Sequence, residues 1–392
     1  MRAATATTEP GHRPAGSAAA AGIPWYLWCA ALAVTSAYVG GYWDISWHRS
    51  IGRDTFWSAP HMAIYACGVL AGISSAFMIF STTFGRDRAA RDVSVRIWGL
   101  RGPLGAFISA WGGVAMLASA PFDDWWHNAY GLDVKIISPP HMVLAGGFFG
   151  IELGTVMLLL AFMNRAAEDT RRRLQWLFLY VGGTVVSESL LLKMEYISRS
   201  DQHTALFYIV VSIGTPAALM AIAIASRHRW AMTIMAAVYS AFALFFLWLL
   251  PLFPAEPKLG PVLHPVTHFI PWEFPLLIVV PAAVVDWLLS RTASQRPLVR
   301  APMAGLAFLI TFIATQWPFA KFLMTPLARN WFFGTEYMDY GTPPDSQYAQ
   351  NLFYASEPGP QFWRGMLVAG LISCGMMYVG LHAGRVMRRV KR

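Results

Sequence analysis

Two copies of one acid–histidine pattern stand in the N-terminal half of the chain. Each copy has an aspartate, a histidine four residues later, and a second histidine thirteen or fourteen residues after the first. The copies are Asp44, His48 and His61, and Asp123, His127 and His141. Imidazole and carboxylate bind copper, zinc and iron, and three protein ligands leave coordination positions open for water, dioxygen or a substrate. The spacing therefore predicts two metal sites, although the ligand count alone does not choose the metal.

The residues around each copy predict how its ligands are brought together. An aspartate and a histidine four residues apart on a helix share one face. Pro60 and Pro140 suit the first turn of a helix, and His61 and His141 follow them directly. A helix end, a loop and the start of the next helix are therefore expected to form a hairpin around each three-ligand pocket.

Further polar residues lie beside both copies. Asp54, Asp124 and Asp133 are candidates for orienting the ligand histidines through hydrogen bonds without binding the metal themselves. Arg53 could pair with an acid of its own copy. The alternative is that all these groups anchor helix ends at the membrane interface, where tryptophans such as Trp47 are frequent. Two copies with nearly the same spacing favour the metal sites over that alternative.

The composition is that of a membrane protein, because 56% of the residues are hydrophobic and only 13% are charged. A soluble domain carries about 25% charged residues. Apolar runs of about 20 residues, long enough to cross the hydrocarbon core as helices, recur along the chain. About ten spans are expected, at 25–43, 61–82, 103–121, 141–163, 175–194, 205–226, 230–251, 269–289, 302–320 and 364–384. We expect an all-α polytopic membrane bundle, because an open sheet would leave unpaired backbone groups in lipid.

The net charge of +9 is explained by where the basic residues lie. Arginines cluster after the second, fourth, sixth and eighth predicted spans and at the C-terminus, which is one side of a ten-span topology. The positive-inside rule then places both termini in the cytoplasm and the metal sites near the extracytoplasmic side of a bacterial-type cytoplasmic membrane. This distribution is not typical of nucleic-acid binding. Residues 1–22 lack an apolar core and are predicted to be a disordered tail.

The first copy and its surroundings resemble the metal motif of the C-type subunit of the copper membrane monooxygenases, a family that includes the particulate methane and ammonia monooxygenases. The matching residues are Asp44, Trp47, His48, Arg53, Asp54, Thr55 and His61. The second metal segment of that C-type chain is matched by Gly102, Pro103, Asp124, Trp125, His127, Pro140 and His141. Asp123 stands where the family typically has asparagine, which makes this second site more anionic. The resemblance covers about residues 24–165.

A less extensive resemblance, to the A-type subunit of the same complex, covers residues 230–385. It rests on short elements in the family's order: Phe274 and Pro275, Pro281 and Ala282, Asp286, Leu289 and Ser290, Gln316 to Pro318, and Tyr340 to Pro343. Together the two resemblances predict a metal-binding membrane domain at 23–165 and a second membrane domain at 175–392. The junction is expected at 164–174.

The resemblance implies copper at one or both sites, with iron and zinc less favoured. It also implies activation of dioxygen to oxidise a short hydrocarbon or ammonia, electrons from quinol, and assembly into an oligomeric complex. The B-type subunit of the family has soluble β-rich domains, and the sequence has no long region of this kind, so a separate B-like chain is expected as a partner. The alternative function is a copper-binding membrane protein for metal uptake, storage or delivery without catalysis, and a bis-histidine haem protein is a third interpretation.

Two glutamates, Glu152 and Glu188, fall inside predicted spans. Ionisable groups are costly there and usually face the interior of a helix bundle or a cavity. A role in proton transfer, support of a metal ligand, and a plain hydrogen bond to a neighbouring helix are all compatible with the sequence. The cysteines Cys29, Cys67 and Cys374 also fall inside spans and are expected to be buried apolar side chains.

Overall fold

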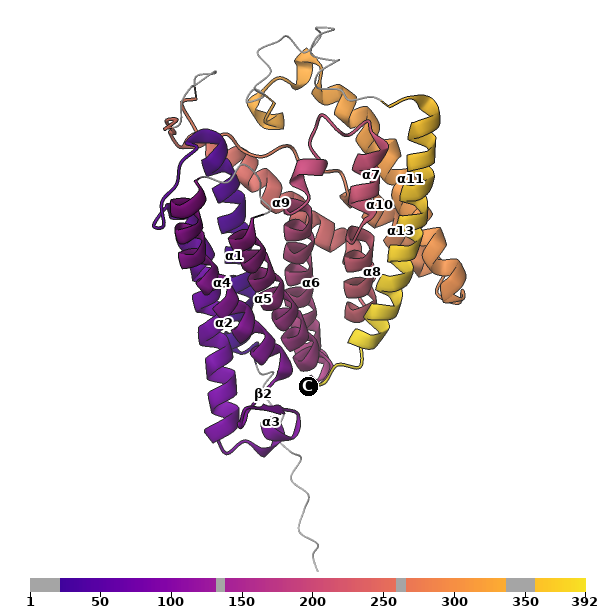
Figure 1. Cartoon of the computed structure of the whole chain (residues 1–392). Helices are drawn as coiled ribbons and strands as arrows, with labels where there is room; N and C mark the ends of the chain where they lie inside the picture. The colour runs from indigo at the N-terminus through magenta and orange to yellow at the C-terminus, as the bar shows by residue number, and fades with distance from the viewer. Residues whose placement is uncertain (1–21, 132–137, 259–265, 336–356) are drawn as a thin grey trace, which may run out of the picture.

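The computed structural model describes residues 22–131, 138–258, 266–335 and 357–392, which fold into a helical bundle (Figure 1). Residues 1–21 of the predicted tail lie outside the described residues, as does Asp133. In the described part of the chain, eight helices are long and apolar enough to cross a membrane. The predicted all-α membrane bundle is therefore confirmed at this level.

The first helices are α1 (Trp25–Ser50), α2 (Ala59–Phe84), α3 (Arg88–Asp92), α4 (Leu104–Tyr130) and α5 (Pro139–Met163), with an antiparallel hairpin of β1 (Val95–Ile97) and β2 (Leu100–Gly102) between α3 and α4. The later helices are α6 (Glu168–Leu191), α7 (Ala205–Ser212), α8 (Thr215–Ser226), α9 (Ala231–Leu249), α10 (Val279–Arg291), α11 (Pro297–Leu323) and α13 (Gly359–Met387). Short 3-10 helices are η1 (Met194–Tyr196), η2 (Leu250–Leu252), η3 (Pro326–Ala328) and η4 (Trp331–Phe333).

Two of the ten predicted spans lie outside this set of eight. The predicted span 25–43 is helical, as the first part of the 26-residue α1. The predicted span 269–289 is helical only from Val279, in α10. Its 13 residues extend about 20 Å, less than the hydrocarbon core of about 30 Å. Pro271 and Pro275 explain the late start, because proline lacks the backbone N–H that a helix interior needs.

The predicted span 205–226 consists of two helices, α7 and α8, with a break at Ile213 and Gly214. Gly214 has a φ of +81°, a left-handed conformation that glycine adopts without a steric penalty. The Lys193 ammonium donates hydrogen bonds to the Ile213 carbonyl and to Thr215 Oγ1. Lys193 therefore satisfies a backbone acceptor that the break leaves outside the helical pattern.

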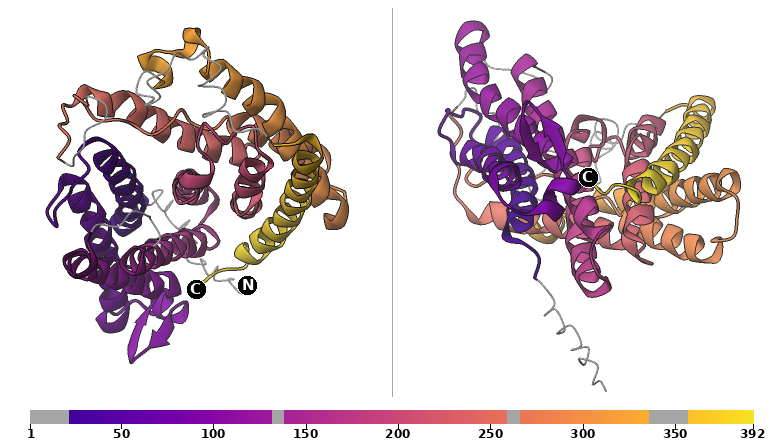
Figure 2. Two further views of the ribbon diagram at one scale, coloured as in Figure 1. Left: turned by 45° about the horizontal axis from the view of Figure 1, so that its top comes forward. Right: turned by 90° about the horizontal axis from the view of Figure 1, so that it is seen from below.

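Close helix crossings fix α1 against α2 and α4 against α5. These helices lie together on one side of the molecule, and α11 and α13 lie on the other (Figure 2). A Cβ added at Gly40 in α1 would lie 2.7 Å from the backbone nitrogen of Ile64 in α2. A Cβ added at Gly112 in α4 would lie 2.6 Å from the backbone nitrogen of Ile151 in α5. Small residues at such crossings let membrane helices pack closely. This packing fixes the position of each helix along the axis of its partner.

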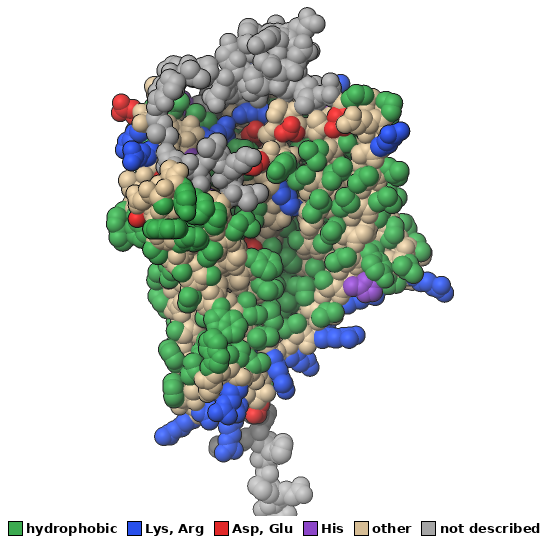
Figure 3. All heavy atoms as spheres, in the orientation of Figure 1, with side chains coloured by type: hydrophobic (Ala, Val, Ile, Leu, Met, Phe, Trp, Pro, Cys, Tyr) green, Lys and Arg blue, Asp and Glu red, His purple; other side chains and the backbone are tan. Residues whose placement is uncertain are grey.

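The C-terminus and the first turn of α5 lie at opposite ends of the bundle. Asn164, just after α5, donates hydrogen bonds to the carbonyls of Met387 and Val390 near the C-terminus. The 25 residues of α5 extend about 38 Å from there to its first turn. Lys and Arg side chains line the lower end of the molecule in Figure 3, where the C-terminus lies in Figure 1, and hydrophobic side chains cover its middle.

The largest hydrophobic core joins helices from both predicted membrane domains. It includes Leu158 of α5, Phe178 of α6 and Phe312 of α11, all fully buried. The division of the chain at 164–174 therefore stays a prediction from the sequence.

Candidate metal centre

The first predicted site gathers four side chains where α1 ends and α2 begins. Asp44 and His48 lie on the last two turns of α1, Asp54 lies in the connecting loop, and His61 lies in the first turn of α2. We call these four residues the first ligand group. Asp44, Asp54 and His61 each offer one ligand atom, and these three atoms lie within 4.8 Å of one another. This spacing suits a single metal ion.

Asp54 lies closer to His61 than the sequence suggested. Asp54 Oδ2 is 2.9 Å from His61 Nε2, and Asp44 Oδ1 is 3.5 Å from the same nitrogen. His48 Nε2 lies 3.7 Å from Asp44 and 3.6 Å from Asp54, and its side chain is 45% exposed. Of the three predicted ligands, the structure therefore brings Asp44 and His61 to one point together with Asp54. His48 lies beside both carboxylates but outside this set.

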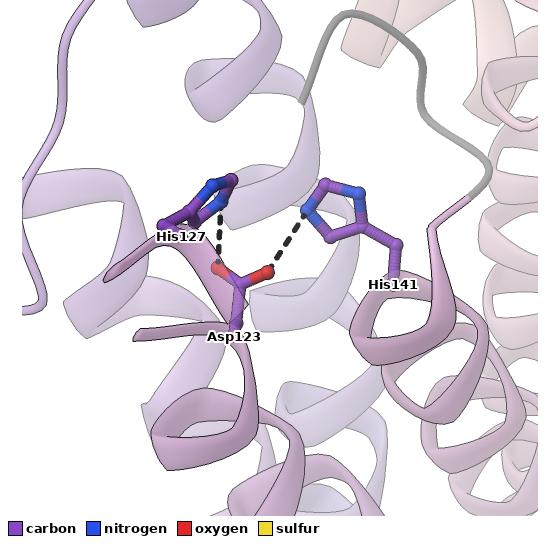
Figure 4. A group of neighbouring side chains, drawn as sticks. All are labelled: Asp123, His127 and His141. Atoms are coloured by element: carbon purple, nitrogen blue, oxygen red, sulfur yellow. Dashed lines mark ion pairs between the residues drawn. The ribbon is translucent and has the colours of Figure 1, made fainter. Parts of the chain in front are cut away.

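The second ligand group is Asp123, His127 and His141, and it has the predicted composition (Figure 4). Asp123 and His127 lie at the end of α4, and His141 lies in the first turn of α5. The carboxylate of Asp123 faces both rings, with 3.5 Å to His127 Nε2 and 3.6 Å to His141 Nε2. All three ligand atoms lie within 4.8 Å of one another, so these side chains converge on one point.

A turn after α4 holds the ring of His127. His127 Nδ1 lies 3.0 Å from the carbonyl oxygen of Gly131, which is a hydrogen-bond distance. Gly131 has a φ of +89° and brings its carbonyl back toward the helix end. When Nδ1 donates this hydrogen bond, Nε2 carries the lone pair that a metal needs. Gly131 is not among the predicted site residues, although a glycine four residues after a histidine at a helix end signals such a turn.

The second histidine of each copy starts a helix as predicted. Pro60 and Pro140 occupy the first turns of α2 and α5. Ser138 caps α5, because its hydroxyl accepts a hydrogen bond from the backbone N–H of His141 at 3.4 Å. In the first group, the Trp47 indole N–H donates to the Arg53 carbonyl at 3.0 Å and so holds the loop between α1 and α2.

Both ligand groups open into one cavity of about 470 Å³. Asp54 and His61 line it from the first group, and Asp123 and His127 line it from the second. Tyr65 lies in the same lining, with its ring centroid 6.0 Å from that of His61 and its hydroxyl donating to the Phe56 carbonyl. A small molecule in this cavity would contact both groups.

The other predicted supporting residues lie around the same cavity. Arg53 and Asp124 line it, and Asn128 donates a 3.4 Å hydrogen bond to the Asp124 carboxylate. Asp133, the remaining candidate, lies outside the described residues. The charges of the two ligand groups act on one another, since Asp44 lies within electrostatic range of His141, and His61 within range of Asp123.

The carboxylates carry negative charge that their protein partners do not fully satisfy. Burial favours the neutral form of Asp54, but the hydrogen bond from His61 and the nearby imidazoles outweigh it, so the pKa of Asp54 lies below its ordinary value. Oδ1 of Asp44 and Oδ1 of Asp123 are buried and accept no hydrogen bond from the described residues. Buried carboxylate oxygens normally have partners, so both groups suit a bound cation.

Comparison of the chain with models of known protein families, with curated proteins and with solved structures gave no match.

Proposed function

We propose that the two ligand groups bind copper and that the chain is the copper-binding membrane component of a monooxygenase-type complex. The observation that carries this proposal is the pair of imidazole–carboxylate groups opening into one cavity. Mixed nitrogen and oxygen ligands suit copper, and the resemblance of residues 24–165 to the copper membrane monooxygenases favours it over iron and zinc. Copper bound there would supply the redox chemistry that activates dioxygen.

The protein side chains have distinct tasks in this proposal. Asp44 and Asp123 would each bring a carboxylate between two histidines, and the Gly131 carbonyl would keep His127 in the tautomer that binds through Nε2. Asp54, held as a carboxylate, would add negative charge to the first group. Tyr65 and the cavity walls would hold a small substrate, such as a short hydrocarbon or ammonia, beside both groups.

The placement in the membrane and the partners belong to the same proposal. The basic residues at the C-terminal end favour a cytoplasmic location for that end, by the positive-inside rule. The ligand groups would then face the extracytoplasmic side. A separate B-like chain, an oligomeric assembly and quinol as the electron source follow from the family resemblance.

Copper analysis of purified protein tests the metal assignment. We expect wild-type protein to bind two copper ions, and His61→Ala and His141→Ala each to lose one. His382→Ala is the matched control, because this exposed histidine lies on α13 and packs on Tyr378. Full copper content in the His61→Ala/His141→Ala double variant would refute the assignment.

Turnover separates the enzyme from a copper carrier, which is the alternative function. We expect copper-loaded protein, supplied with the products of neighbouring genes and a quinol, to oxidise a short alkane, an alkene or ammonia in an oxygen-dependent reaction. The His61→Ala variant should lose this activity, and His382→Ala should keep it. Copper binding without turnover under these conditions would favour uptake, storage or delivery.

A further inference from the structure

Two glutamates on neighbouring helices meet inside the bundle, apart from both ligand groups. Glu152 of α5 is 9% exposed and Glu188 of α6 is 4% exposed. Their carboxyl groups lie within interaction range of each other. Buried ionisable groups are costly in a membrane and usually serve a function. The metal-binding proposal uses neither residue.

Glu152 lies near the middle of the membrane-spanning helix α5. Glu152 is 11 residues after His141 and 11 residues before Met163, which is about 16 Å of helix on either side. The hydrocarbon core of a bilayer is about 30 Å thick. Bulk water is therefore distant from Glu152 at both ends of α5, whereas Glu188 lies in the last turn of α6.

Two buried carboxyl groups that lie close together require a proton. Ionised carboxylates only accept hydrogen bonds, so a bond between two carboxyl groups forms only when at least one is protonated. Two bare carboxylates in this apolar position would also repel each other at a high desolvation cost. The burial of both carboxyl groups on two packed helices therefore favours at least one bound proton.

Among the described residues, the surroundings provide no cation that could replace this proton. The ionisable neighbours are Tyr38 of α1, which interacts with Glu188, and Cys67 of α2, which interacts with both glutamates. Of the other helices packed on the pair, α8 has no ionisable side chain and α9 has only Tyr239. The ionisable residues of α4 all lie at its end, from Asp123 onward.

Three polar atoms of these helices are buried and lack a hydrogen-bond partner among the described residues. Glu152 Oε1 and Glu188 Oε2 are buried without a hydrogen-bond partner in the described residues. Thr155 lies one helical turn from Glu152 on the same side of α5, and its fully buried hydroxyl likewise has no partner there. Two carboxyl groups and a hydroxyl are too few ligands for a calcium-like cation, which takes six to eight oxygens.

We propose that Glu152 and Glu188 form a proton-binding site in the membrane interior, in which the two carboxyl groups hold one proton between them and exchange it with water. The site belongs to the fold and does not depend on copper. Its position below the candidate metal centre would allow it to store a proton within the same bundle.

Infrared spectroscopy of the full chain in lipid bilayers tests this site. We expect wild-type protein at neutral pH to show the C=O stretch of a buried carboxylic acid, and the band to shift when H₂O is replaced by D₂O. The Glu152→Gln/Glu188→Gln variant should lose the band. In each single variant the glutamine N–H can donate to the remaining carboxylate, so the fold is retained while the band shifts or disappears. Glu195→Gln, at an exposed position, is the matched control and should keep the band.

Several results would overturn the proposal. No acid band in the wild type, or an unchanged band in both single variants, would show that the pair does not hold the proton. A band that never responds to D₂O would show a fixed structural contact. Loss of the wild-type band on addition of Na⁺ or Ca²⁺ alone would identify a cation site instead.

Discussion

Asp54 Oδ2 lies 2.9 Å from His61 Nε2, whereas the nearest approach of Asp44 to that nitrogen is 3.5 Å. The ring nitrogen that is expected to bind the metal therefore already faces two carboxylates. In the second ligand group a single aspartate, Asp123, contacts both histidines. The first group is consequently the more anionic of the two in the described residues, because two carboxylates stand beside its histidines.

Replacing Asp54 should weaken metal binding at the first ligand group. The Asp54→Asn change keeps the size of the side chain and removes the charge nearest His61 Nε2. We expect the copper affinity of the first group to fall about 10–100-fold, with the second group unchanged. Copper titration in the His141→Ala background measures the first group alone. Asp92→Asn, at an exposed position in α3, should leave the affinity at its wild-type value.

An alanine at position 131 should loosen the second ligand group. Gly131 has a φ of +89°, and a Cβ added there would meet nothing within 4 Å, so backbone strain is the only penalty. That strain costs about 1–3 kcal/mol and is relieved when the carbonyl turns away from His127 Nδ1. Copper bound by the second group should therefore dissociate faster in Gly131→Ala, as a stopped-flow chelator assay would show. The control is Gly375→Ala on α13, where a Cβ also meets nothing.

Adding a methyl group at the glycine of each helix crossing should affect the two ligand groups separately. Gly40→Ala forces α1 away from Ile64 of α2, and Gly112→Ala forces α4 away from Ile151 of α5. Overpacking of this kind costs about 1–3 kcal/mol. We expect Gly40→Ala to reduce copper at the first group and Gly112→Ala to reduce it at the second. Equal loss at both groups in each variant would instead indicate a general loss of fold.

The sequence predicted the helices well where apolar runs were uninterrupted. The runs at 61–82 and 141–163 are parts of α2 and α5, because no proline lies within them. Prolines and a glycine explain the two predicted spans that are not single long helices. Pro271 and Pro275 delay α10, and Gly214 divides 205–226 into two helices. Hydropathy averages over such residues, so the length of an apolar run does not reveal them.

The site was predicted as far as helical spacing determines it. A four-residue interval places Asp123 and His127 on one helix face, and a proline before His141 starts the next helix, as the structure confirms. The direct contact of Asp54 with His61 depends on the path of the loop between α1 and α2, which spacing does not determine. The proximity of Glu152 to Glu188 depends on how α5 is rotated against α6, which a single sequence also does not specify.

The free energy of unfolding should depend on pH through the titration of Lys193. This side chain follows α6, and burial lowers the pKa of its ammonium to about 8. In the unfolded chain the ordinary pKa is about 10.4, so between these values the unfolded state binds more protons than the folded state. The free energy of unfolding should therefore rise as the pH increases from about 8 to 10.

Lys193→Met removes this titrating group and should flatten the rise. Urea unfolding in detergent micelles at several pH values, followed by tryptophan fluorescence, measures the slope. Lys391→Met, at the exposed C-terminal end, should keep the wild-type slope. A variant at position 193 with the wild-type slope would mean that Lys193 keeps its proton throughout this range. Because the ammonium donates to the Ile213 carbonyl at the break between α7 and α8, that result would also show that this hydrogen bond outweighs the cost of burying the charge.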